Sequence, residues 1–403
     1  MLSPSILDNN KLFEEYLTTK DVSLMPQRGQ LDSRSDCEIN KLFLMNAPMD
    51  TVLQLDQLGI HLAGGQYETH LKDSKHYIVV PRSEAKIAYR KFLNTDEKMR
   101  KHYNSLLESG RTEIDARDIV YQSWPNGYRY TFRTLLEKQI LSIGADQESL
   151  NDFINFARTM FTNEAFRIDN GKHSLKVMVD IAHGWSNLAI KAYERLHREI
   201  GSLLNLFIIS GSVANPACVK DLRPYVDAFR VGIGCGSICS TRLVTGVGVP
   251  NLTAVYQFKQ KLEAWSHYFS NDKQKYVIAD GGISEYGDIV KYLAAGADYC
   301  MLGRMYAECI DSPANDVYRG QASREYQLDH KGYVSNTTPE GIQVKLRKNG
   351  MTAFELDEEI CGAVRSACSY LGLDSINQLN PHNVTFIKVS SWGRLEAETI
   401  KSL

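Results

Sequence analysis

From about residue 175 onward, short apolar runs alternate with segments of helical spacing. LKVMVDIA is a continuous apolar run of strand length, and SNLAIKAYERLHREI follows it with apolar residues every three to four positions. The same succession continues through LNLFIISGSV, NPACVKDLRPYV, FRVGIG, YVIADGG, YGDIVKYLAAGA and DYCMLG. Strands that alternate with helices and lack hairpin turns are joined by crossovers, so this pattern predicts parallel strand–helix units.

Glycine and acidic residues follow these strands, in the loops that carry the chemistry of a closed parallel barrel. They are Asp180, Gly211, Gly234, Asp280 and Gly303. Five consecutive units of this kind favour a closed barrel over an open sheet. We therefore expect an α/β fold, a (β/α)8 TIM barrel, with residues 1–403 forming a single catalytic domain.

Two polar segments depart from the barrel pattern. Residues 95–130 are charged and have little strand character, which predicts an insertion on the barrel, with a helix as one possible structure. The segment from Tyr318 to Asn349 is polar and contains glycine, and its length is typical of a mobile flap over an active site.

Composition and charge narrow the classes of partner. With 43% hydrophobic and 23% charged residues and a formal charge of −2, the chain offers no polyelectrolyte surface for nucleic acid or anionic lipid. Apolar runs of membrane-spanning length and a signal peptide are both absent from the sequence. The eight cysteines are scattered without a C-x-x-C pair, which disfavours structural zinc and a disulfide framework. We expect a cytoplasmic protein that acts on a small molecule.

The stretch GIGCGSICSTR, residues 232–242, concentrates candidate chemistry after one predicted strand. Its spacing fits neither a dinucleotide fingerprint nor a P-loop, and a tight strand-to-helix turn is the simplest alternative. Its glycines let backbone groups approach a ligand or a cation. Cys239 stands where the loop would turn into a helix, a position that favours a nucleophilic thiolate. Cys235 is the competing candidate, and spacing alone does not separate the two.

The continuation GIGCGSICSTRLVTGVGVPNLTAV resembles the signature of the IMP dehydrogenase/GMP reductase superfamily. TKDVSLMPQRGQLDSRSD, NAPMDTV, VDIAHGW, VIADGGI, DYCMLGR, YRGQAS, PEG and CGAVRSACSYLG come in the order of that family. The resemblance implies a (β/α)8 barrel assembled as a homotetramer. It implies that Cys239 attacks C2 of a purine nucleoside monophosphate, and that hydride moves between C2 and a nicotinamide. It also implies a monovalent cation, such as potassium, held by carbonyls of Gly234, Gly236 and Cys239.

The same resemblance assigns further positions. It makes Asp180 the acid that holds the nicotinamide ribose, with a helix-capping acid as the alternative, and it makes Thr241 and Glu340 a proton-handling pair. Arg304 stands where the family has a small residue, and either pairs with the phosphate or points to solvent. Gln321 replaces a methionine beside the purine. The substrate-binding set is Ser237, Asp280, Gly282, Gly303, Arg304, Tyr318, Gly320, Gln321 and Ser323.

Three features place the chain closer to GMP reductase in organisation. The residues of this chain that do not match the family's motifs are too few for the paired regulatory (CBS) module that the dehydrogenases usually carry. The flap lacks the Arg-Tyr dipeptide whose arginine activates water in dehydrogenases, and the interval from Tyr318 to Glu340 is short. We therefore expect NADPH-dependent conversion of GMP to IMP and ammonia.

Other features keep alternatives open. AHG, YRG and PEG are more typical of dehydrogenases, so IMP dehydrogenase with NAD is the first alternative. The substitution at Gln321 allows a modified or deoxy purine nucleotide as substrate. A non-catalytic nucleotide-binding regulator is the third alternative, which the joint presence of Cys239, Thr241, Asp280 and Glu340 disfavours.

Overall fold

The computed structural model describes most of the chain. The described residues are 15–41, 43–49, 76–82, 85–86, 97–98, 101–113, 115–116, 119, 139–162, 174–203, 205–268, 273–314, 316–334 and 338–398.

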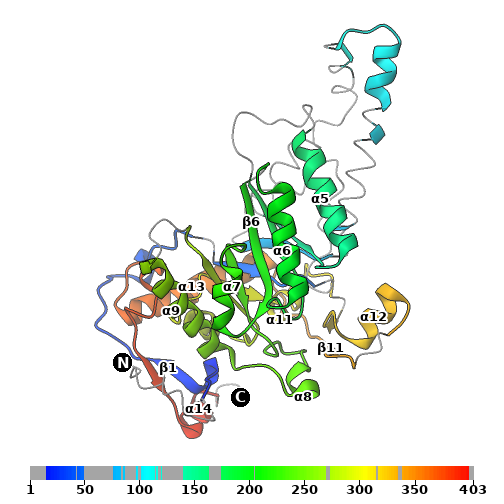
Figure 1. The fold of residues 1–403 in the computed structure, drawn as a ribbon. Helices are drawn as coiled ribbons and strands as arrows, with labels where there is room; N and C mark the ends of the chain where they lie inside the picture. The colour runs from blue at the N-terminus through cyan, green and yellow to red at the C-terminus, as the bar shows by residue number, and fades with distance from the viewer. Residues whose placement is uncertain are drawn as a thin grey trace.

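Eight parallel strands close into a barrel, which confirms the predicted (β/α)8 fold (Figure 1). In barrel order they are β2 (Leu44–Asn46), β3 (His76–Val80), β4 (Gln139–Ile143), β5 (Ser174–Val179), β6 (Asn205–Val213), β7 (Ala228–Val231), β8 (Tyr276–Asp280) and β9 (Tyr299–Leu302). The first strand pairs with the last, with Leu44 opposite Cys300. Since all strands run the same way, their carboxyl ends meet at one mouth.

Helices follow the strands and cover the barrel. They are α5 (Gln147–Thr162), α6 (Asn187–Ile200), α7 (Val219–Leu222) after a 3-10 turn (Pro216–Cys218), α9 (Asn251–Tyr268), α10 (Tyr286–Ala294), α11 (Arg304–Ala307) and α13 (Ala353–Leu371). Helix α6 illustrates the local cause, because the Ser186 hydroxyl caps its first turn by accepting a hydrogen bond from the Ala189 amide. Its buried residues recur at helical spacing and are Ala189, Ala192, Tyr193, Leu196 and Ile200.

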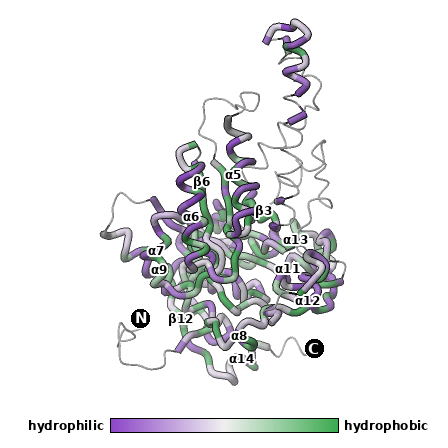
Figure 2. The backbone as a smooth tube through the Cα atoms, turned by 45° about the vertical axis from the view of Figure 1, so that its right-hand side comes forward, coloured by the Kyte–Doolittle hydropathy of each residue, from purple (hydrophilic) through white to green (hydrophobic). Residues whose placement is uncertain are grey.

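Two apolar layers hold the barrel. Alternate strand residues, among them Val79, Met178, Ile209 and Ile278, fill its interior, while the residues between them pack against the helices. Partly buried aromatic rings of Tyr77, Phe207, Tyr276 and Tyr299 pack on the interior cluster in a chain of edge-to-face and tilted contacts. In strand β6 the hydrophobic part is Leu206–Ile209 (Figure 2).

Two small antiparallel sheets lie outside the barrel. Strand β1 (Val22–Leu24) pairs with β12 (Phe386–Lys388), and β10 (Val317–Arg319) pairs with β11 (Gln343–Lys345). The second sheet forms the base of the predicted flap and carries α12 (Arg324–Lys331) between its strands. The remaining elements are the 3-10 turns Thr19–Asp21, Arg34–Asp36 and Ile376–Gln378, the short α8 (Thr241–Thr245) and α14 (Ser391–Glu398).

The predicted insertion at 95–130 lies partly outside the described residues. Within it, residues 101–108 are helical and stand away from the barrel, beyond α5 (Figure 1). Gly211 was expected to follow a strand, but it lies inside β6. At this point of β6 the pairing register with β7 shifts between Ser210 and Val213. Among the described residues, none of the helices is long and apolar enough to span a membrane.

Candidate active site

The glycine loop leaves β7 at the mouth of the barrel, and two of its glycines have backbone angles that favour glycine. Gly232 has φ +153° and Gly234 has φ +75°. A Cβ on Gly232 would lie 1.9 Å from the carbonyl oxygen of Asp280, so a larger residue would push the loop off β8. The loop ends in α8, whose N-cap is Ser240. Cys239 therefore lies just before a helix start, as predicted.

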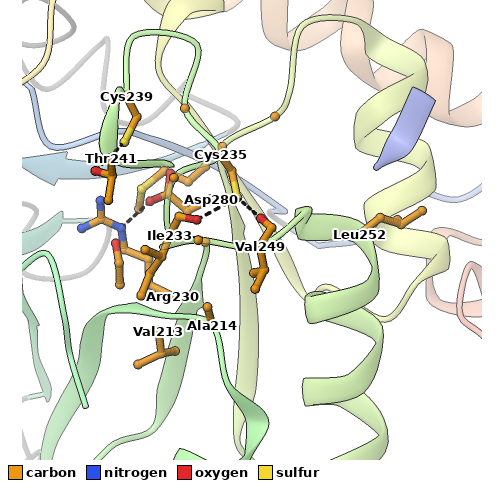
Figure 3. A pocket seen from close by; sticks show the side chains of 18 of the residues that line it. Val213, Ala214, Arg230, Ile233, Cys235, Cys239, Thr241, Val249, Leu252 and Asp280 are labelled. Atoms are coloured by element: carbon orange, nitrogen blue, oxygen red, sulfur yellow. Dashed lines mark hydrogen bonds and ion pairs between the residues drawn. The ribbon is translucent and has the colours of Figure 1, made fainter. Parts of the chain in front are cut away.

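The two cysteines of the loop have different surroundings. The Cys239 thiol is half-buried and lies 3.2 Å from the Thr241 hydroxyl, in the open part of the site (Figure 3). The Cys235 thiol instead donates a hydrogen bond to the Val249 carbonyl at 3.0 Å. Burial, together with the negative charge of Asp280, raises the pKa of Cys235 to about 12. Cys235 is therefore a protonated packing residue at neutral pH, which leaves Cys239 as the candidate nucleophile.

Residues 340–342 of the flap pair with residues 238–240 of the glycine loop. The Ser240 amide donates to the Glu340 carbonyl at 2.9 Å, and the Ile342 amide donates to the Ile238 carbonyl at 3.0 Å. Cys239 and Gly341 form an isolated antiparallel bridge. This pairing brings Glu340, distant in sequence, to the loop that carries Cys239.

One large cavity joins the predicted site residues. Its volume is about 1950 Å³, more than a single drug-sized ligand needs, so there is room for a nucleotide and a dinucleotide together. Of the predicted residues, those that line it are Asp180, Gly234, Gly236, Ser237, Cys239, Thr241, Asp280, Gly282, Gly303, Arg304, Tyr318, Gly320, Gln321 and Glu340. Ser323 is not among the lining residues. It is fully buried, and its hydroxyl caps α12 by accepting a hydrogen bond from the Tyr326 amide.

Arg230 also lines the cavity, and the sequence patterns did not predict it as a site residue. Its guanidinium pairs with Asp180 through Nη1 at 2.6 Å and with Asp280 through Nε at 2.7 Å (Figure 3 shows it under Asp280). Burial by itself lowers the pKa of Arg230, but the two carboxylates outweigh burial, so this pKa lies above its ordinary value. A charged residue inside the apolar strand FRVGI was the signal that could have revealed it.

A second arginine reaches Asp180 from another strand end. Arg82 follows β3, and its Nε lies 3.3 Å from the Asp180 Oδ2 atom. Burial disfavours the Asp180 carboxylate, yet the positive charges of Arg82 and Arg230 outweigh burial and hold the pKa of Asp180 below its usual value. Asp180 is therefore a carboxylate at neutral pH.

A second group of lining residues carries donors that suit an anion. The Tyr318 hydroxyl lies near Ser237, and it is so close to Gly303 that a Cβ there would lie 2.3 Å from it. Arg304 lines the cavity with its side chain 49% exposed, and its Nε pairs with Glu308 at 2.8 Å. An exposed guanidinium held by one carboxylate keeps donors available for an incoming anion.

The residues present fit a nicotinamide cofactor and a monovalent cation in their donor chemistry. Asp180 Oδ2 is buried and faces Arg82 Nε at 3.3 Å, yet it accepts no hydrogen bond from the described residues, so it keeps acceptor capacity for a ribose hydroxyl. The described residues hold no cluster of three or more histidines, cysteines or acids that would suit a divalent metal. Backbone carbonyls are the ligands that potassium takes in proteins; Gly234 has φ +75°, and the Gly236 carbonyl already accepts the Cys239 amide at 3.0 Å.

Comparisons with known proteins converge on one family. A family model described as "IMP dehydrogenase / GMP reductase domain" matches residues 169–399. Inosine-5'-monophosphate dehydrogenase of Chlorobaculum tepidum is 34% identical over 245 residues, 55% of this chain and 46% of that protein. The enzyme of the same name from Nitrosopumilus maritimus is 34% identical over 242 residues, 55% of this chain and 48% of that protein. The chain thus matches about half the length of these relatives. The one from Borreliella burgdorferi is 27% identical over 421 residues, 94% of this chain and 96% of that protein.

Proposed function

Because this chain belongs to the IMP dehydrogenase/GMP reductase family, we propose that it is an oxidoreductase of purine nucleoside monophosphates that reduces GMP to IMP. In this proposal GMP, NADPH and two protons give IMP, ammonium and NADP⁺. Cys239 is the nucleophile, and Thr241 and Glu340 handle protons. The proposal further includes a homotetramer that works in the cytoplasm.

The chemistry assigned to the chain's own residues begins at the Cys239 sulfur. The thiolate adds to C2 of the purine, the C2–N bond of the amino group breaks, and ammonia leaves once the Thr241 hydroxyl and Glu340 have delivered a proton. NADPH, when bound, supplies the hydride that reduces C2. Expulsion of the Cys239 thiolate then releases IMP and restores the site.

The observation that supports this proposal best is the convergence on Cys239. The Thr241 hydroxyl lies 3.2 Å from the Cys239 thiol. The Glu340 carbonyl accepts a hydrogen bond from the amide of Ser240, the residue after Cys239. A proton path needs groups within hydrogen-bond reach of one another, and the proposal is supported because all three residues line the same cavity. The absence of an Arg-Tyr dipeptide from the flap sequence favours release of ammonia over activation of water.

IMP dehydrogenase is the second candidate, and the comparison with Borreliella burgdorferi favours it. That relative bears the dehydrogenase name, yet it aligns with this chain over nearly all of both lengths. The lack of room for a regulatory module therefore does not separate reductase from dehydrogenase. The flap sequence becomes the main argument for the reductase.

The test is nicotinamide absorbance with matched substrate pairs. With GMP and NADPH, the absorbance of the reduced nicotinamide should fall at a rate that depends on enzyme concentration. With IMP and NAD⁺, this absorbance should not rise. Turnover of IMP alone would replace the reductase by the dehydrogenase. If neither pair turns over, deoxy and base-modified monophosphates are the next substrates. A 6-halopurine monophosphate that binds without forming an adduct on Cys239 would indicate a non-catalytic regulator.

Arg304 provides a prediction for phosphate binding. In Arg304→Ala, we expect KM for the nucleotide to rise about tenfold with kcat little changed, because a charge-assisted hydrogen bond to the phosphate is lost. Steady-state kinetics with the monophosphate and with the corresponding nucleoside measure this. With the nucleoside, which has no phosphate, the variant and the parent protein should have the same KM. An equal defect for both would show that Arg304 acts on the fold rather than on the phosphate.

Replacement of potassium provides a prediction for the loop. If carbonyls of Gly234, Gly236 and Cys239 hold a monovalent cation, exchanging potassium for lithium should lower kcat about tenfold or more, because the small ion fits a carbonyl ring poorly. Activity at constant ionic strength is the measurement. Equal rates in potassium, sodium and lithium salts would remove the cation from the proposal and leave the rest of it intact.

A further inference from the structure

Arg82 connects two parts of the site that lie on different sides of the cavity. It follows β3 at the mouth of the barrel, after the buried Pro81. Its Nε faces the Asp180 carboxylate, and its Nη2 donates a hydrogen bond to Gln321 Oε1 at 2.9 Å. Gln321 follows β10 at the start of the flap, 239 positions along the chain. One planar guanidinium therefore contacts both a strand-end acid and the flap.

The Gln321 amide is held at both ends. Its oxygen accepts from Arg82, and its Nε2 donates to the Pro48 carbonyl, next to the end of β2. With both ends engaged, the side chain has one orientation, and that orientation depends on the position of Arg82. The start of the flap is thus fastened to the barrel mouth through side chains, in addition to the backbone pairing of Glu340 and Ile342.

The two arginines on Asp180 differ in burial. The side chain of Arg230 is 13% exposed and engages both aspartates, whereas that of Arg82 is 41% exposed. Of the two arginines, Arg82 is the one that donates a hydrogen bond to a flap residue, so its loss would change the flap more. A guanidinium fork can serve two acceptors at once, which a lysine ammonium at the same distance does less well.

We propose that Arg82 is a positioning residue that couples the start of the flap, through Gln321, to the cofactor acid Asp180. A dinucleotide that engages Asp180 then stabilises the flap contact, and an intact flap contact favours dinucleotide binding. The coupling rests on the proposed function, because it takes Asp180 as the acid that holds the cofactor ribose. The fastening of Gln321 by Arg82 is independent of any ligand.

The experiment compares Arg82→Met, Arg82→Lys, Gln321→Met and the double variant Arg82→Met/Gln321→Met, with Lys86→Gln as the matched control. Lys86 lies on the same segment and pairs with Glu148 at 2.6 Å, away from the cavity lining. In ligand-free protein, tryptic cleavage within α12 should be about tenfold faster in Arg82→Met than in the control. Arg82→Lys should resemble Arg82→Met, because a lysine keeps the charge but lacks the guanidinium fork that serves two acceptors.

The coupling is tested by measuring the affinity for NADPH, with quenching of tryptophan fluorescence as the signal. NADPH should bind about tenfold more weakly to Arg82→Met, with nucleotide affinity within about twofold of the parent. The double variant should be no more than about twofold weaker than either single variant, because both remove one interaction. Unchanged cleavage in Arg82→Met overturns the proposal, and so do independent, multiplying losses in the double variant. If the parent protein binds neither NADPH nor NAD⁺, the proposed function fails, and cleavage alone still decides the fastening of the flap.

Discussion

Replacing Cys239 by alanine should lower turnover about a thousandfold or more, because the step that forms the covalent intermediate loses its nucleophile. The half-buried thiol beside Thr241 is the proposed nucleophile, and it lines the cavity. The variant should still bind the nucleotide, since the groups assigned to the phosphate and the ribose remain. Mass spectrometry after incubation with a 6-halopurine monophosphate should show an adduct on the parent protein and none on the variant.

The matched control is Cys235→Ser, four residues away. A serine hydroxyl preserves the donor to the Val249 carbonyl, so activity should stay within about threefold of the parent protein. Full adduct formation in Cys239→Ala, or loss of the adduct in Cys235→Ser, would exchange the roles of the two residues. Equal defects in both variants would indicate that the loop as a whole, rather than one sulfur, was disturbed.

Replacing Arg230 by methionine should be the most destabilising change at the site. It leaves Asp180 and Asp280 as buried or half-buried carboxylates without their shared partner, and breaking such a pair costs about 3 to 5 kcal/mol of unfolding free energy. Activity should also fall, since the same residues line the cavity. Urea unfolding, read by far-UV circular dichroism, measures the stability. Arg230→Lys should recover part of it, because it restores the charge but engages one carboxylate at a time.

The loss should depend on pH in a definite direction. In the parent protein the pKa of Asp180 is lowered, so its carboxylate contributes stability above its unfolded pKa of about 4 and loses it as pH falls through the folded value. Without Arg230, Asp180 keeps only the ion pair with Arg82, burial has more weight and the pKa of Asp180 rises, so acidification neutralises a charge that is less well compensated. The gap in unfolding free energy should therefore be smaller at about pH 5 than at about pH 8. An equal gap at both values would point to lost packing instead.

The strands and the reactive loop could be predicted because their signals are local. Apolar runs separated by helical spacing are sufficient to identify β5 to β9, and a strand-end acid in a barrel has few places to be other than the mouth. The roles of Arg82 and Arg230 could not be obtained this way, because each depends on which strand ends become neighbours when the barrel closes. An arginine in an apolar strand signals a buried partner but does not say which one.

Two other features were beyond the sequence patterns for different physical reasons. Ser323 was expected in the substrate site, but a serine that begins a helix is equally able to cap it, and here the cap accounts for its hydroxyl. The contrast between Cys235 and Cys239 depends on the path of the loop, which turns one sulfur toward the Val249 carbonyl and the other toward Thr241. Residue type and spacing are the same for either arrangement.

The pairing of β1 with β12 has a consequence for synthesis on the ribosome. Val22 lies opposite Lys388, so the partner strand of β1 is translated only after all eight barrel strands. Barrel closure between β2 and β9 requires residues up to 302 and can come earlier. We expect the early strand to wait with an unpaired edge while the barrel assembles, which makes it the part of the nascent protein most in need of protection from aggregation. A chain that stalls after the barrel but before β12 would display that edge permanently.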